Sequence, residues 1–298
     1  MKKATLHITN GSILTEKLEE LDIKGDYLTW HEMLCEGPTT ELIDTQEFLD
    51  LRKSFFNSIY DLEIDENEFH KEINKLNHPE NYSDIVLWFE YDLFCHLNLV
   101  AVISLIKQKG IELPIYLVCS GRIKGQSDLK GLGELSTAQL LKHYKEKIKL
   151  SLEDLDIATT VWRIYCGRNH NLLKSFIVQS SSFDYLSNCL KAHLQRFPET
   201  KCGLSIIERH IIKTIKNNDI KSKHHFLGYI LNYQAFYGYG DLQIKRIIDT
   251  LDIFYIEKEK KLKLNSKGKE ALSNKSNFAK ELNNNSDINA TFESIFTY

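Results

Sequence analysis

The stretch Ile85–Asp92 (IVLWFEYD) indicates the fold of the N-terminal half of the chain. A strand expected over residues 84–89 is apolar after its first residue, as is typical of a strand covered on both faces of a parallel sheet. The long apolar run that follows predicts a helix over Leu93–Lys109, which ends at Gly110. The strand would end beside Glu90 and Asp92, at the edge where open α/β sheets bind ligands.

Further strands and helices alternate on both sides of this stretch. Strands are expected at Leu6–Thr9, Asp26–Trp30 and Ile115–Cys119, and helices at Gln46–Tyr60 and Asn67–Leu76. This alternation predicts an α/β fold with a Rossmann-like parallel sheet built of right-handed crossovers. We expect an α/β ligand-binding domain over residues 1–135 and, because helical patterns dominate after it, a helical connector over residues 136–200.

The C-terminal part has the outline of a winged helix. Three helices are expected at 206–215, 225–232 and 241–251, followed by two short strands, 253–256 and 262–264, around the charged turn EKEKK. Ser205 and Glu208 have the spacing of a capping box. We therefore expect a winged-helix-like domain over residues 201–275 and a loose, Asn- and Ser-rich tail over residues 276–298.

Composition and charge support two modules with different partners. The 298 residues are 42% hydrophobic and include only 4 prolines, as in a globular protein. Residues 201–270 hold fourteen Lys and Arg against eight Asp and Glu, while the whole chain has a net charge of −3, so residues 1–200 are acidic. An acidic front and a basic back favour a small-molecule partner for the first and a nucleic-acid or protein partner for the second.

No targeting or membrane signal is evident. The six cysteines form no C-x-x-C pair, which favours reduced thiols in the cytosol. The N-terminus lacks the apolar stretch of a signal peptide. The longest apolar runs are far shorter than the ~18–20 residues that span a bilayer. We expect a cytoplasmic protein with no membrane partner.

Carboxylates and turn-forming residues cluster at the expected strand ends. The candidate catalytic carboxylates are Glu36, Glu90, Asp92 and Glu134. Such a set could hold Mg²⁺ through oxygen, or bind the hydroxyls of a ribose or the amines of a base. Each also has a structural explanation, since Asp92 could only cap a helix and the glutamates could only be solvated. His96, four residues after Asp92, could share a ligand or a proton with it.

The candidate ligand contacts lie in the same motifs. They are Asn10, Gly11, Ser12, Trp30, Gly37, Gly131 and Gly133. A strand-to-helix turn can present N–H groups to an anion, and glycine allows close approach of the backbone. Ser12 could cap the next helix, and Trp30 could equally be a core residue. Arg52 and Arg122 are the nearest candidates for a phosphate, and no P-loop, G-x-S-x-G or H-E-x-x-H motif is present.

Several of these motifs occur in a known family. The segments LHITNGS, WHEMLCEGP, WFEYDLF, KGLGEL and GLSIIERHII together resemble the bacterial domain of unknown function 1835 family. The resemblance is clearest over the front domain and extends more loosely through Phe197 to Leu251. This chain has Ser12 where the family usually has aspartate, and Tyr91 where histidine is common. The resemblance implies the two-part fold and the site, and it implies no reaction.

The candidate nucleic-acid contacts lie in the basic C-terminal part. Lys245 and Arg246 belong to the third expected helix, and the hairpin adds Lys258, Lys260, Lys261 and Lys263. In a winged helix the helix would read the groove and the hairpin lysines would bind phosphates. Asp241, Asp249 and Asp252 disfavour a phosphate surface, so a module for protein contacts is the alternative.

Three functions fit the sequence. The first is a sensor, in which a nucleotide or similar ligand binds the front domain and the back contacts nucleic acid or a partner protein. The second is a hydrolase or transferase that acts at the carboxylates with Mg²⁺ as a cofactor. The third is a structural interaction protein, which the lack of a common catalytic motif favours.

Overall fold

The structure is a computed structural model that describes residues 3–123, 125 and 128–284. The chain divides into an N-terminal unit, Met1–Leu190, and a C-terminal unit, Lys191–Tyr298. Helices and a mostly parallel sheet confirm the expected α/β class. The helices that follow residue 136 belong to the N-terminal unit as far as Leu190.

A five-stranded sheet forms the centre of the N-terminal unit. Its strands are β1 (Ala4–Asn10), β2 (Asp26–Trp30), β3 (Tyr82–Phe89), β4 (Ile115–Cys119) and β5 (Ile148–Lys149), in the order β2-β1-β3-β4-β5. The first four pair in parallel and β5 is antiparallel to β4. The sequence pattern predicted helix instead of strand at Ile148–Lys149. A strand of two exposed residues is too short to show the alternation that would indicate it.

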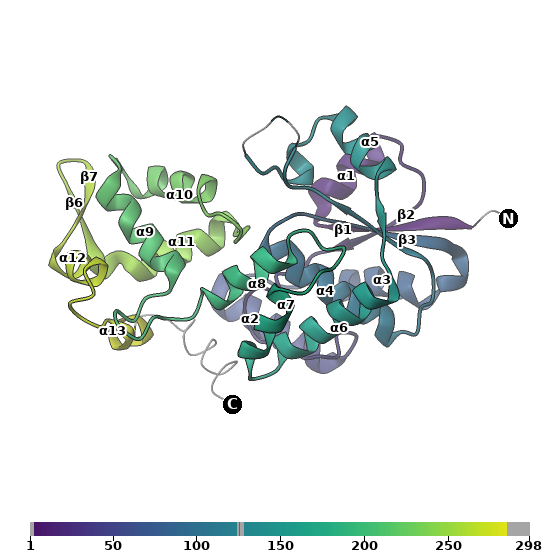
Figure 1. The fold of residues 1–298 in the computed structure, drawn as a ribbon, viewed down its shortest axis with the longest axis horizontal. Coiled ribbons are helices and arrows are strands. Elements are labelled where there is room, and N and C mark those ends of the chain that lie inside the picture. The colour runs from purple at the N-terminus through teal and green to yellow at the C-terminus, as the bar shows by residue number, and fades with distance from the viewer. Residues whose placement is uncertain (1–2, 124, 126–127, 285–298) are drawn as a thin grey trace. The chain divides into compact units, whose positions relative to one another are not determined.

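Helices cover both faces of this sheet (Figure 1). On one side lie α1 (Ser12–Glu20) and α5 (Thr137–Lys145), whose Leu14, Leu18 and Leu140 pack on Trp88 of β3. On the other side lie α4 (Leu93–Gln108) and α6 (Leu152–Cys166), together with α2 (Gln46–Tyr60) and α3 (Glu66–Asn74). Helix α4 is apolar all round because it packs against the sheet and α6, and thirteen of its residues are buried.

Short elements complete this unit. They are the 3₁₀ turns η1 (Lys75–Asn77), η2 (Pro79–Asn81), η3 (Leu132–Glu134) and η4 (His170–Leu173) and the helices α7 (Lys174–Ile177) and α8 (Leu186–Leu194). The division between the two units falls within α8. Within the described residues, no helix is long and apolar enough to cross a membrane.

The C-terminal unit consists of helices and one hairpin. Its elements are α9 (Ile206–Asn217), α10 (Lys223–Asn232), α11 (Asp241–Thr250), η5 (Leu251–Phe254), β6 (Tyr255–Lys258), β7 (Lys261–Leu264), α12 (Ser266–Leu272) and α13 (Ala279–Asn284). The predicted capping box is confirmed, since Ser205 Oγ accepts from Glu208 N–H and the Glu208 side chain accepts from Ser205 N–H.

The segment expected to begin a loose tail packs on this unit as far as α13. Phe278 is 3% exposed, and its N–H donates to the carbonyl of Cys202 (2.9 Å). Leu282 is buried as well. Burial of the apolar Phe278 and Leu282 side chains stabilises the packing of this segment, which a purely polar tail could not gain. Residues 285–298 of the expected tail lie outside the described residues.

Candidate functional site

The carboxyl ends of β1 and β3 meet where the strand order reverses. The chain leaves β1 toward β2 on one side, and β3 pairs with β1 on the other. In open α/β sheets, ligands bind outside the carboxyl ends of the strands at such a point. Asn10 and Gly11 follow β1 here, and Glu90 and Asp92 follow β3. The structure therefore brings together residues from two of the sequence motifs.

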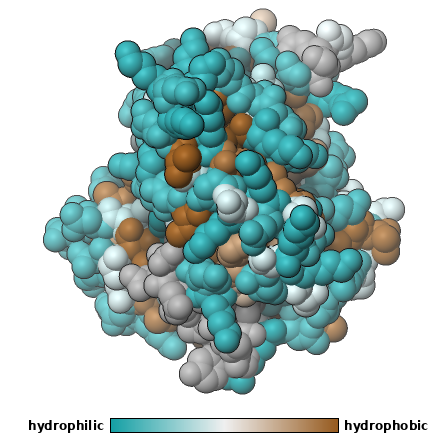
Figure 2. Space-filling view, turned by 90° about the vertical axis from the view of Figure 1, so that its left-hand side faces the viewer, coloured by the Kyte–Doolittle hydropathy of each residue, from teal (hydrophilic) through white to brown (hydrophobic). Residues whose placement is uncertain are grey.

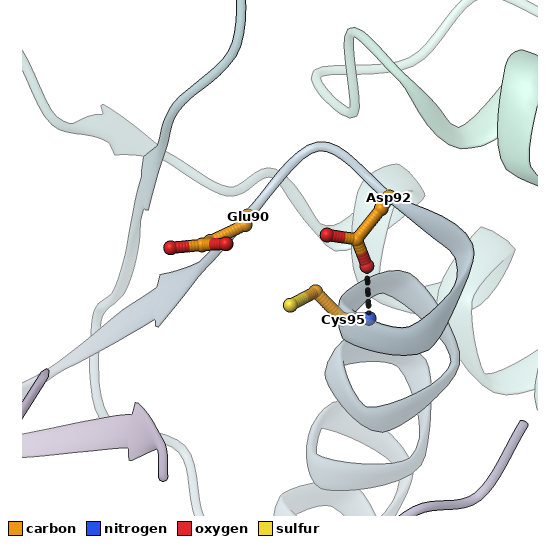
Figure 3. Close-up of side chains that lie close together, drawn as sticks. All are labelled: Glu90, Asp92 and Cys95. Atoms are coloured by element: carbon orange, nitrogen blue, oxygen red, sulfur yellow. Dashed lines mark hydrogen bonds between the residues drawn. The ribbon is translucent and has the colours of Figure 1, made fainter. Parts of the chain in front are cut away.

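Glu90, Asp92 and Cys95 form a cluster at this edge (Figure 3). One ligand-type atom from each lies within 4.8 Å of the others, and no other such group of three occurs in the part of the chain that the structure describes. Glu90 comes from the end of β3, Asp92 from the N-cap of α4, and Cys95 from the first turn of α4. The strand-to-helix turn has only three residues, Glu90, Tyr91 and Asp92, and this short connection places the two carboxylates next to each other.

Asp92 combines a capping role with an unusual charge state. Its Oδ1 accepts from the N–H of Cys95 (2.8 Å), so the capping role considered from the sequence is confirmed. The side chain is 7% exposed, and burial, with the Glu90 charge as a smaller cause, raises the pKa of Asp92 to about 7. The carboxyl group is thus poised between its two protonation states near neutral pH.

Glu90 lies under the turn η3. The N–H of Gly133 donates to Glu90 Oε1 (3.2 Å), and a Cβ on Gly131 would lie only 2.4 Å from Glu90 Oε2. The close approach that Gly131 allows is therefore to the Glu90 carboxylate. Burial raises the pKa of Glu90 above its ordinary value. Lys17 of α1 fixes this turn by donating to the carbonyl of Gly133 (2.8 Å).

Cys95 is a neutral thiol in this setting. Burial, followed by the charges of Asp92 and Glu90, raises the pKa of its thiol well above the ordinary value. Asn10 Nδ2 donates to Cys95 Sγ (3.1 Å), which joins the end of β1 to the cluster. A neutral thiol beside two carboxyl groups is a poor nucleophile, since the thiolate is the reactive form. All six cysteines are outside disulfide bonds.

Sequence reasoning missed Asn98 as a member of this site. Its Nδ2 donates to Asn10 Oδ1 (2.8 Å) and to the carbonyl of Glu32 (2.6 Å), and its Oδ1 accepts from Leu34 N–H (3.1 Å). Asn98 therefore fixes Asn10 relative to the loop after β2. Its position inside the apolar run LNLVAVISLI was the available signal, because a buried amide must find hydrogen-bond partners.

His96 does not share a proton with the Asp92 carboxylate. Its Nδ1 lies 3.2 Å from the backbone carbonyl of Asp92, and burial lowers the pKa of the ring to about 4. His7, in the LHITNGS motif, is also neutral. Trp88 Nε1 donates to its Nδ1 (3.1 Å), and burial lowers the pKa of its ring. Both histidines are buried in the core.

Arg52 is not available for a phosphate, contrary to the expectation from the sequence. Its side chain is completely buried, and its Nε donates to Glu32 Oε2 (2.9 Å). The other guanidinium donors bind the carbonyls of Met33 (2.9 Å), Glu36 (2.7 Å) and Pro38 (3.1 Å). All these groups belong to the loop after β2, so Arg52 holds that loop in place through its hydrogen bonds. Arg122 remains exposed.

Glu36 and Gly37 lie in the same loop. The Glu36 side chain is 4% exposed and accepts a hydrogen bond from the Tyr60 hydroxyl. Gly37 has a φ of 77°, and a Cβ there would meet the ring of Phe55 at 2.5 Å. The contacts of both residues thus belong to packing around Arg52, and Glu36 is not a member of the Glu90 cluster.

The remaining predicted contacts have diverse settings. Gly11, with φ of 98°, is the N-cap of α1, and Ser12 is its first residue and makes no side-chain cap, so the expected Ser12 cap is wrong. The left-handed φ at this turn explains the glycine. Trp30 is 3% exposed and lines a cavity beside β2. Glu134 is exposed at the end of η3.

The C-terminal basic residues differ in how they are paired. Lys245 on α11 and Lys258 and Lys260 on the hairpin are exposed. Lys261 pairs with Asp219 (2.8 Å) and Lys263 pairs with Glu259 (2.6 Å). Arg246 is half-buried. The face at the left of Figure 1, which includes β6 and β7, is mainly hydrophilic with small, separated hydrophobic areas (Figure 2).

Comparisons with known proteins give little further information. No protein-family model matches the chain, and no curated protein matches it. A solved structure that it is similar to is the DNA-binding, cleavage and re-ligation domain of Plasmodium falciparum topoisomerase II, with 14% sequence identity and a TM-score of 0.47. That alignment covers 84% of this chain and 42% of the other, so the chain spans less than half the length of that structure.

Proposed function

We propose that the N-terminal unit binds a phosphate-bearing small molecule, with a nucleotide as the first choice, at the carboxyl edge between β1 and β3. The observation that supports this most is the Glu90–Asp92 pair. Asp92 is buried and Glu90 is half-buried, and no ion pair to either is formed by the residues that the structure describes. The nearby Lys17 charge lowers the pKa of Glu90 but does not offset the effect of burial, which raises it. Burying carboxyl groups without a paired counter-charge is costly, so this edge favours a ligand that brings a cation.

Mg²⁺ fits the donor set. It prefers hard oxygen ligands and is usually held by one or two carboxylates together with substrate phosphates. Glu90 and Asp92 would supply the carboxylates, whereas the Cys95 thiol is a soft ligand that Mg²⁺ does not favour. Helix α1 begins at the same edge, after Asn10 and Gly11, and no side chain caps it. A helix N-terminus favours an anionic group, which suits the phosphate of such a ligand.

Thermal unfolding of the full chain tests this proposal. A ligand that binds the folded state raises the melting temperature, so Mg²⁺ with ATP should raise it more than either does alone. Glu90→Gln should remove the Mg²⁺-dependent part of the rise. Glu112→Gln is the matched control, because Glu112 is exposed just before β4 begins, at the amino edge of the sheet. No response to Mg²⁺ or Mn²⁺ in the presence of ATP would contradict the proposal.

A second candidate function is catalysis by the same pair, as a hydrolase or transferase. The favouring observation is that the adjacent carboxyl groups have different partners, Gly133 N–H for Glu90 and Cys95 N–H for Asp92. Two carboxyl groups in unlike settings can act as general acid and general base. Release of phosphate from ATP that Asp92→Asn abolishes, with ATP binding retained, would support an enzyme. Binding without turnover in the wild-type chain would favour a sensor.

For the C-terminal unit we propose a winged-helix-like module that contacts nucleic acid, with a protein partner as the alternative. The order α9, α10, α11 and a β6–β7 hairpin supports it. Glu259 and Lys260 at the hairpin tip have φ values of 55° and 58°, as in the two-residue turns that keep hairpin strands paired. This turn presents Lys258 and Lys260 to solvent, where they can contact phosphates.

Gel-shift titrations of the full chain with duplex DNA at several salt concentrations test this module. Each lysine–phosphate contact adds about 0.9 to the slope of log affinity against log salt. Replacing Lys258 and Lys260 with Ser should lower the slope by about 2 if both lysines bind phosphates. The same change at Lys261 and Lys263, which are already paired with carboxylates, should lower it less. Absence of binding at low salt would favour the protein-contact alternative and a purely structural role.

The family and the location complete the proposal. The motifs quoted above support membership of the bacterial domain of unknown function 1835 family. Six cysteines outside disulfide bonds support a cytoplasmic location, because reducing compartments keep thiols reduced.

A further inference from the structure

A basic groove lies in the C-terminal unit, lined by the end of α9, strand β7 and helix α12. These three elements pack against one another (Figure 1), and the groove has a volume of about 860 Å³. Buried Ile215 and Leu262 give it an apolar part. Four lysines line it against two carboxylates, and these residues are Lys216, Lys261, Lys263, Lys269, Asp219 and Glu259. The groove therefore favours an anionic partner.

The four lysines of the groove differ in how they are paired. Both carboxylates of the lining pair with lysines of β7, at 2.8 Å for Lys261 and 2.6 Å for Lys263. Lys216 on α9 and Lys269 on α12 are exposed, and neither forms an ion pair within the part of the chain that the structure describes. These two lysines are therefore the first candidates for contacts with an anionic chain.

An exposed pair of tyrosines lies beside this groove. Tyr233 is 59% exposed, and its ring centroid lies 4.7 Å from that of Tyr229 on α10. The Tyr229 hydroxyl donates to Oδ1 of Asn218 (2.9 Å), and Asn218 follows the last residue of α9 and lines the groove. This hydrogen bond holds the aromatic pair next to the lysines of the groove.

A basic groove and an exposed aromatic ring together suit one class of partner. Proteins that bind single-stranded nucleic acid combine a positive groove along the backbone with aromatic side chains on which bases stack. A duplex could use the lysines, but its base faces are covered by neighbouring bases. An acidic peptide could pair with the lysines as well, but it offers the tyrosine no base to stack on.

We infer that this groove and Tyr233 bind a single-stranded segment of nucleic acid. Its phosphates would contact Lys216 and Lys269, and one of its bases would stack on the Tyr233 ring. The hairpin tip with Lys258 and Lys260 is a different surface of the same unit. The inference therefore goes beyond the proposed function, and it does not depend on the outcome of the duplex titrations.

Fluorescence anisotropy of the full chain with labelled strands of about 12 nucleotides tests this inference. The strands are oligo-dU, oligo-rU and an abasic strand that keeps the phosphates and loses every base. The abasic strand should bind about tenfold more weakly than oligo-dU, as the loss of one stacked base predicts. Oligo-rU should bind as oligo-dU does, because the carboxylates and the Asn218 amide of the lining are already bonded and do not select for a 2′-hydroxyl. No binding of oligo-dU at low salt, or equal binding of the abasic strand, would overturn the inference.

Variants locate the binding. Tyr233→Ala should weaken oligo-dU about tenfold and leave the abasic strand unchanged, whereas Tyr233→Phe keeps the ring and should bind as the wild type does. Replacing Lys216 and Lys269 with Ser should lower the slope of log affinity against log salt by about 1.4, since each phosphate contact on a single strand adds about 0.7. The same change at Lys275 and Lys280, which are exposed outside the groove, is the matched control and should leave the slope unchanged. Equal effects of Tyr233→Ala on both strands, or an oligo-glutamate peptide that competes as well as oligo-dU, would contradict the inference.

Discussion

The N-terminal unit contains two groups of buried charged residues that are built in opposite ways. Around Arg52, one guanidinium faces the Glu32 carboxylate and three backbone carbonyls, and it lies 5.0 Å from the ring centres of both Phe55 and Phe56. Around Asp92, two carboxyl groups and a thiol lie together, and burial raises the pKa of each.

The difference separates a structural role from a binding role. The Arg52 cluster satisfies its own charge and hydrogen bonds, so it holds the loop after β2 without help from a ligand. The Asp92 cluster gathers like-charged groups in a low-dielectric place, which lowers stability unless they stay protonated or a cation joins them. Strongly perturbed groups of this second kind are typical of functional sites. The following predictions test whether the two clusters differ in this way.

The largest effect is expected at Arg52. Arg52→Met keeps the apolar stem but leaves Glu32 buried and unpaired, so the free energy of unfolding should fall by about 3–5 kcal/mol. Urea denaturation followed by circular dichroism measures it. Lys53→Met, on the same helix, removes an exposed pair with Glu66 and should change the midpoint little. Wild-type stability in Arg52→Met would show that the cluster does not hold the loop.

Asp92→Asn should have the next largest effect, and it should be stabilising at high pH. Asparagine retains the oxygen that caps α4. The folded state binds the Asp92 proton more tightly than the unfolded state, since the pKa rises from 3.8 to about 7. The wild-type chain therefore loses stability as the pH rises through this window, while the variant does not. The gain from the substitution should be near zero below about pH 4, roughly 1–2 kcal/mol near pH 5 and roughly 3–4 kcal/mol above pH 7.

Neighbouring groups determine how this measurement is read. Burial lowers the pKa of His96 to about 4, so its contribution to stability changes in the opposite direction, rising with pH. His96 is present in both proteins, and the difference between them removes its effect. The Glu90 charge is one of the smaller causes that raise the pKa of Asp92, and Glu90 is likewise present in both proteins. A gain that is the same at pH 5 and pH 8 would contradict the charge state assigned to Asp92.

The contrast between the clusters also shows what the sequence could predict. The bounds of β2, β4 and α2 are confirmed because their patterns are local, and the Asp92 cap follows from a strand end next to a helix start. Arg52 was predicted as a phosphate contact because its partners, 14 to 20 positions away, become visible only when the loop after β2 folds over it. The contact of Asn10 with Cys95 joins residues 85 positions apart, which no local pattern indicates.

Gly131→Ala should have a small effect on stability and a large effect on the Mg²⁺ response. The new Cβ would meet the end of the Glu90 side chain, which can rotate away at little cost. Glu90 would then leave Asp92 and the proposed ion. The rise in melting temperature with Mg²⁺ and ATP should fall to near that of Glu90→Gln. Gly133→Ala is the matched control, because a Cβ there has open space and the φ is not positive. Gly125→Ala also has open space, but its φ of 85° would strain the variant. A full Mg²⁺ response in Gly131→Ala would contradict the role of Glu90.

The smallest effect is expected at Tyr60, which tests whether Glu36 belongs with Arg52 or with the ligand site. Tyr60→Phe removes the hydroxyl that donates to Glu36 Oε2 and leaves the ring contacts with Phe55 and Phe56. The free energy of unfolding should fall by about 1 kcal/mol, as for one hydrogen bond. The Mg²⁺ and ATP response should stay at the wild-type value, because Glu36 packs in the Arg52 loop. If Tyr60→Phe left stability intact but weakened ATP binding, Glu36 would belong to the ligand site. The separation of the structural Arg52 cluster from the ligand-binding Asp92 cluster would then fail at this residue.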